Sequence, residues 1–84
     1  MKPEIAFAHA FTNTVNSIEQ NFSNGATVSV SMGNRGDVLK AAGEHMKKEG
    51  WNVDFLESIA PGEDYRAFLV VRLPVKENSV APEQ

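Results

Sequence analysis

The stretch from Gly25 to Leu73 constrains this chain more than any other feature, because it alternates between patterns typical of strands and of a helix. It reads as strand, glycine-containing turn, helix, strand, tight turn and strand, and a long amphipathic helix precedes it. Few residues are left over. We therefore expect one α+β domain over residues 1–74, followed by a disordered tail at residues 75–84, where the periodic apolar pattern stops.

The first expected element is a helix that ends at Asn24-Gly25, a pair typical of a helix C-terminus. Its large apolar residues are three or four positions apart and therefore share one face. These residues are Phe7, Phe11, Val15, Ile18 and Phe22. We expect this face to pack in the core rather than in a partner's groove, because the later strands need a cover.

A strand and a second helix are expected next. In residues 26–32, Val28, Val30 and Met32 alternate with hydroxyl side chains, which predicts a strand that buries its apolar residues and exposes a polar face. A glycine-containing turn follows, in which Asn34 is expected to cap the second helix. The apolar stripe of that helix consists of Val38, Leu39, Ala42 and Met46.

Two further strands are expected at residues 51–59 and 65–73, with a turn at Pro61-Gly62 between them. The last strand is apolar on both faces in its middle, which is typical of a central strand. The strand–helix–strand succession predicts a right-handed crossover and a parallel pair, whereas the tight turn predicts an antiparallel pair. We therefore expect a two-layer α/β sandwich in which a three-stranded mixed sheet carries both helices on one face.

The composition of the chain excludes several classes of function. The 84 residues carry a formal net charge of -3, which opposes non-specific binding to nucleic acid. The chain has no cysteine, which excludes disulfides, thiolate nucleophiles and zinc–thiolate sites and favours a reducing compartment. The first residues show no long apolar run, so we expect a cytoplasmic protein without a signal peptide or a membrane span.

The two histidines, His9 and His45, have no cysteine or second histidine at the neighbouring helical positions, so we expect neither a metal site nor a cofactor. No spacing indicates a nucleophile with a histidine and an acid, so we expect no catalytic residues and no enzyme activity. A binding protein is the remaining class.

Three surfaces are candidates for binding. If both helices cover one sheet face, the other face is open and becomes an interface formed by Arg66, Phe68, Val70 and Arg72. The hairpin carries an acidic set that could dock on a basic groove: Asp54, Glu57, Glu63 and Asp64. The turn before the second helix is a weaker candidate, for an anion site, because a purely structural turn explains its residues better. It consists of Gly33, Asn34, Arg35 and Gly36.

From these surfaces we expect a small cytoplasmic protein-binding module, an adaptor or inhibitor of the kind that phages and other mobile elements encode. Its partner is another protein or a second copy as a homodimer. The alternative is a nucleic-acid-binding domain that uses the open sheet face and the basic second helix. The residues of that alternative site are Arg66, Phe68, Arg72, Lys40, Lys47 and Lys48.

Overall fold

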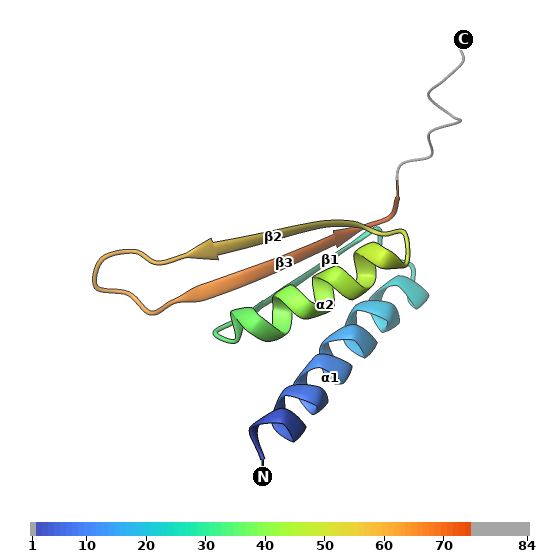
Figure 1. The fold of residues 1–84 in the computed structure, drawn as a ribbon. Coiled ribbons are helices and arrows are strands. Elements are labelled where there is room, and N and C mark those ends of the chain that lie inside the picture. The colour runs from blue at the N-terminus through green and yellow to red at the C-terminus, as the bar shows by residue number, and fades with distance from the viewer. Residues whose placement is uncertain (1, 75–84) are drawn as a thin grey trace.

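The computed structural model describes residues 2–74, so the tail expected at residues 75–84 lies outside the described residues. The elements follow the expected order of helix, strand, helix, strand and strand. They are α1 (Pro3–Ser23), β1 (Val28–Gly33), α2 (Gly36–Lys48), β2 (Asn52–Ser58) and β3 (Arg66–Arg72). Both helices lie on one side of the sheet (Figure 1), which confirms the two-layer arrangement.

The sheet has the strand order β1–β3–β2, and β3 is antiparallel to both neighbours. The central position predicted for β3 is therefore confirmed. The prediction of a mixed sheet is wrong, because β3 lies between β1 and β2 and separates the two strands that were expected to form a parallel pair. β3 is apolar on both faces, and such a strand is best accommodated at the centre of a sheet. This accounts for its place between β1 and β2.

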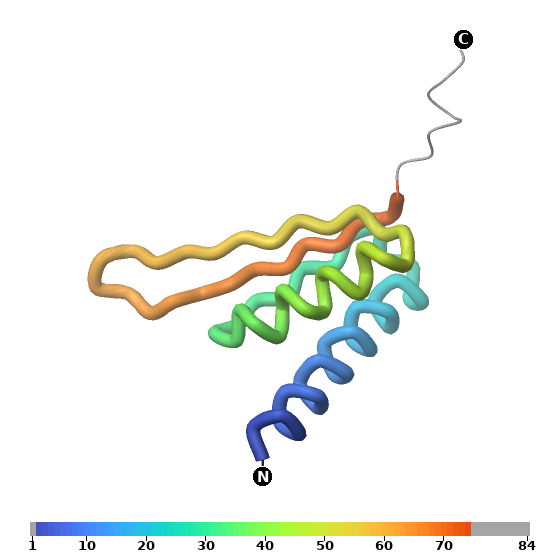
Figure 2. Tube along the Cα trace, in the orientation of Figure 1, coloured from blue at the N-terminus to red at the C-terminus, as the bar shows by residue number. Residues whose placement is uncertain are grey.

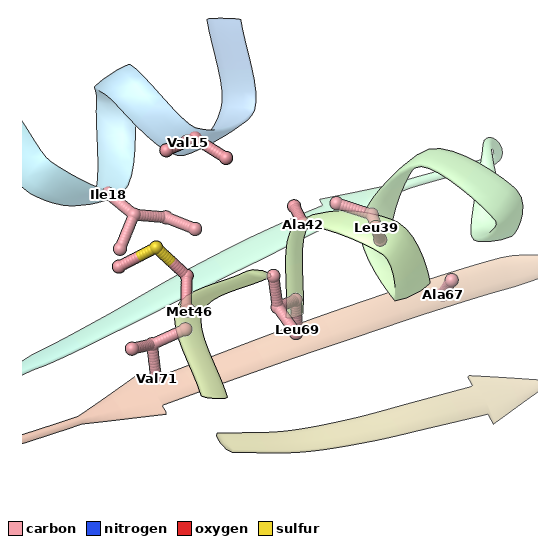
Figure 3. Packing of buried hydrophobic residues seen from close by; sticks show 8 residues of the cluster. All are labelled: Val15, Ile18, Leu39, Ala42, Met46, Ala67, Leu69 and Val71. Carbon is pink, nitrogen blue, oxygen red and sulfur yellow. The ribbon is translucent and has the colours of Figure 1, made fainter. Parts of the chain in front are cut away.

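The core lies between the helices and the inner face of β3 (Figure 3). Its buried residues come from α1, α2 and β3, and they are Val15, Ile18, Leu39, Ala42, Met46, Ala67, Leu69 and Val71. The predicted α1 stripe is confirmed in its C-terminal part, where the Phe22 ring stacks on Trp51 with 4.3 Å between centroids. The N-terminal end of α1 points away from the sheet (Figure 2), and Ile5 there is 44% exposed.

Close backbone approach sets the distance between α2 and the sheet. Gly43 is buried on α2, and a Cβ added to it would lie 2.7 Å from Leu69 Cδ1 and 3.2 Å from Val53 Cγ1. Both distances are shorter than ordinary contacts between carbon atoms. The absence of a side chain at this position therefore allows α2 to pack directly onto β2 and β3.

The start of α2 differs from the prediction. Asn34 does not cap the helix, which begins at Gly36, and no side chain of the preceding residue makes a capping hydrogen bond. The carboxylate of Asp37, inside the first turn, instead accepts a hydrogen bond of 2.8 Å from the Val38 N–H. An acidic residue at this end also favours the helix dipole.

The β2–β3 hairpin extends past the ends of β1 and α2 (Figure 2). The turn is formed as predicted from its Pro-Gly pair: the Glu63 N–H donates to the Ala60 carbonyl at 3.0 Å, and Gly62 has a φ of 80°. This positive φ is the conformation that a type II turn requires of glycine. The pairing of β2 with β3 is continuous from Asn52 to Ser58, so Leu56 belongs to a regular ladder.

Candidate functional site

The register between β1 and β3 decides which side chains face solvent. Directly paired residues share one face of an antiparallel sheet. Val71 is in the core and is paired with Ser29, which is 3% exposed; Val70 is on the other face and is paired with Val30, which is 60% exposed. The prediction that β1 buries its valines and methionine is therefore wrong.

The reason for this reversal lies under α1. The side-chain amide of Asn21 donates a hydrogen bond of 2.9 Å to Ser29 Oγ, which supplies the buried hydroxyl with a partner. A small side chain at this position also gives α1 room to pack over β1. The alternating apolar residues of β1 consequently occupy the face without helices.

We call this face the open sheet face, and its pairings are given by the register of the three strands. One row across the strands joins Met32, Phe68 and Leu56, and the next joins Val30, Val70 and Asp54. The contiguous apolar side chains form an apolar patch that consists of Val28, Val30, Met32, Leu56, Phe68 and Val70. Met32 is 63% exposed and Leu56 is 56% exposed, so the patch meets solvent directly.

The sequence identified only two of the six residues of this patch. It placed Phe68 and Val70 on the open sheet face together with Arg66 and Arg72, and the register agrees with that placement. It missed the contributions of β1 and β2. The apolar character of both faces of β3 was the available signal, since a central strand of this kind needs apolar neighbours on each face.

Two arginines flank the apolar patch, and they differ in whether a carboxylate pairs with them. Arg72 Nη1 lies 2.6 Å from Asp54 Oδ2, so its charge is compensated on the same face. Arg66 lies at the opposite end of β3, across from Ser58. Within residues 2–74, no carboxylate is within ion-pair distance of Arg66. Among the described residues, one end of the open sheet face therefore carries a positive charge that no ion pair compensates.

The acidic residues of the hairpin do not share one face. Asp54 is on the open sheet face, whereas Glu57 is paired with the inward residue Ala67 and therefore lies on the other face. The Tyr65 hydroxyl donates a hydrogen bond of 2.8 Å to Glu57, and this bond raises the pKa of Tyr65 above its ordinary value. Glu63 and Asp64 are exposed in the segment between the two strands.

In the glycine-containing turn before α2, the positive charge of Arg35 is compensated by the neighbouring Asp37. Arg35 contacts Asp37 through Nε at 3.2 Å and through Nη2 at 3.1 Å, and this hydrogen bonding lowers the pKa of Asp37. Gly36 packs so closely against the Tyr65 hydroxyl that a Cβ at this position would clash with it. The anion site predicted at Gly33, Asn34, Arg35 and Gly36 stays a prediction.

The basic residues fall on two sides of the molecule. Lys40, Lys47 and Lys48 are exposed on α2, which covers the inner face of the sheet. Arg66 and Arg72 are on the open sheet face. The structure therefore does not bring the predicted nucleic-acid-binding residues together on one surface.

No family model, curated protein or solved structure matches this chain in the three comparisons that we made. Of the helices in residues 2–74, none is long and apolar enough to cross a membrane.

Proposed function

We propose that this protein is a protein-binding module, of the adaptor or inhibitor type, that docks on a partner protein through its open sheet face. The observation that carries this proposal is the apolar patch, which extends over all three strands and which no element of residues 2–74 covers. Contiguous exposed apolar surface with a polar rim is typical of an interaction site.

The size of the face indicates the kind of contact. Three strands about 4.8 Å apart and about six residues long give a face of roughly 14 by 20 Å. That is on the order of 300 Å² in plan, whereas a standard stable interface buries about 800 Å² on each partner. A contact confined to this face therefore belongs to the small, transient class.

The charges at the rim favour a different protein over a second copy. If the central strands of two copies stack face to face around a two-fold axis, Arg66 of one copy lies over Arg66 or Arg72 of the other. Two Arg66 side chains brought together oppose association. In the other orientation Arg66 meets Arg72, and the one carboxylate on the strands of this face, that of Asp54, is already paired with Arg72. A partner with a flat apolar surface and a carboxylate opposite Arg66 matches the open sheet face better.

The same charges favour a protein over nucleic acid. Of the two arginines on the open sheet face, Arg72 is already paired with Asp54. The lysines of α2 are on the other side of the molecule, and the net charge of the chain is -3. Phosphate binding depends on summed positive charge, which this face supplies at one position only.

The experiment is capture of partners from nuclease-treated host extract, by wild type and by two aspartate variants. Met32→Asp places a charge in the apolar patch. Ile5→Asp is the matched control, because Ile5 is also an exposed apolar residue but lies on the far end of α1. The proposal predicts a protein that wild type and Ile5→Asp capture and that Met32→Asp does not.

Binding of the captured protein to the purified chain must then show the same pattern in calorimetry. Equal binding by Met32→Asp and wild type contradicts the proposal. Two other results contradict it as well. One is a partner captured from untreated extract but not from nuclease-treated extract, which supports the nucleic-acid alternative. The other is a homodimer that Met32→Asp dissociates.

A further inference from the structure

Two helices bring three potential metal ligands together on the side of the molecule opposite the open sheet face. Glu19 comes from α1, His45 from the last turn of α2, and Glu49 from the C-cap position directly after that helix. Their ligand atoms all lie within 4.8 Å of one another. The distance from His45 Nε2 to Glu49 Oε2 is 3.5 Å.

The histidine of this cluster is held in place. His45 is half-buried, and its ring meets the edge of Phe11 at a centroid distance of 5.7 Å with an interplanar angle of 79°. The two carboxylates are available, because no lysine or arginine in the described part of the chain is within ion-pair distance of Glu19 or Glu49.

We propose that Glu19, His45 and Glu49 form a zinc site that bridges α1 and α2. Two carboxylates balance the charge of a divalent cation, and a nitrogen ligand beside oxygen ligands favours Zn²⁺ over Mg²⁺ and Ca²⁺, which prefer oxygen alone. Three protein ligands leave a fourth position for water.

The geometry requires only a small adjustment. Ligand distances near 2.1 Å place the atoms of a tetrahedral zinc site about 3.4 Å apart. The cluster therefore has to contract by roughly an ångström, and both glutamates are exposed and can rotate. The sequence did not predict this set, because a metal site at His45 needs carboxylates from elsewhere in the chain, and Glu19 joins the cluster only through the packing of α1 against α2.

Zinc at this site should stabilise the fold, since the three ligands are brought together only when α1 packs on α2. The test uses the full chain after treatment with a chelator, titrated with ZnCl₂ and followed by calorimetry and thermal unfolding. We expect one Zn²⁺ per chain, and a rise in Tm of about 5–10 °C at a tenfold excess over Kd. The same concentration of MgCl₂ should give no comparable rise.

Zinc binding by substituted chains tests whether these three residues are the ligands. Glu19→Gln keeps the shape of an exposed side chain and removes its charge, and His45→Ala removes the nitrogen ligand; each should weaken zinc binding by an order of magnitude or more. His9→Ala is the matched control and should bind like wild type, because His9 is exposed elsewhere on α1. The proposal is overturned by an absence of saturable zinc binding, by an equal response to Mg²⁺, or by unchanged binding in both Glu19→Gln and His45→Ala.

Discussion

Val30 of β1 lies directly opposite Val70 of β3, and both side chains are on the face of the sheet that carries no helix. A slip of one residue in this pairing would exchange the faces of β1 and bring its valines into the core. The hydrogen bond from Asn21 to the buried Ser29 opposes that slip, because the slip would leave Ser29 Oγ without its partner. This register is what makes the open sheet face apolar.

The register makes a direct prediction about stability. Leu69→Ala should lower the free energy of unfolding by about 2–5 kcal/mol, since Leu69 is fully buried and its truncation leaves a cavity. Met32→Ala should cost less than about 1 kcal/mol, since Met32 meets solvent. Urea denaturation of both variants measures the difference, and similar losses would place Met32 in a core.

Gly43→Ala tests the close approach of α2 to the sheet. Alanine improves helix propensity by about 1 kcal/mol, but overpacking against Leu69 and Val53 costs typically 1–3 kcal/mol. We therefore expect net destabilisation in chemical denaturation. Gly33→Ala is the control, because a Cβ there meets nothing within 4 Å, and its effect should stay within about 0.5 kcal/mol. A stabilised Gly43→Ala variant would contradict the packing described for α2.

The single tyrosine of the chain gives a prediction about pH. The hydrogen bond to Glu57 raises the pKa of Tyr65, so phenolate should form above the ordinary value of about 10 in ultraviolet titration. A raised pKa means that the folded state holds the proton more tightly. This contribution to stability is therefore complete below the unfolded pKa and is lost as the pH rises through the folded pKa. Glu57→Gln should move the titration back toward the ordinary value, and an unchanged titration would show that Glu57 is not the cause.

Much of the fold follows from local pattern. The helix stripes, the Pro61-Gly62 turn and the central place of β3 depend on residues close in sequence or on one strand's own composition. The face of β1 does not, because Val28, Val30 and Met32 alternate equally well with either face buried. Their placement depends on pairing with β3, some forty positions further along the chain.

The candidate sites also divide into features that local sequence predicts and features that depend on long-range packing. The open sheet face could be predicted from Phe68 and Val70, since two helices on one face leave the other uncovered. Its extension over β1 and β2 required the register. The approach of Glu19 to His45 and Glu49 depends on how α1 packs against α2, and no spacing within either helix contains that information.

The last prediction concerns the uncompensated charge on the open sheet face. Arg66→Glu should weaken binding to the captured partner, chiefly by lowering the association rate, because a charge at the rim of an interface steers the encounter. Added salt should reduce the difference between wild type and variant, since it screens exposed charges. Surface plasmon resonance at two salt concentrations measures both effects. Lys47→Glu is the matched control, as it makes the same change of charge on α2, on the other side of the sheet. Equal effects of the two variants would mean that net charge, rather than the position of Arg66 beside the apolar patch, governs the association.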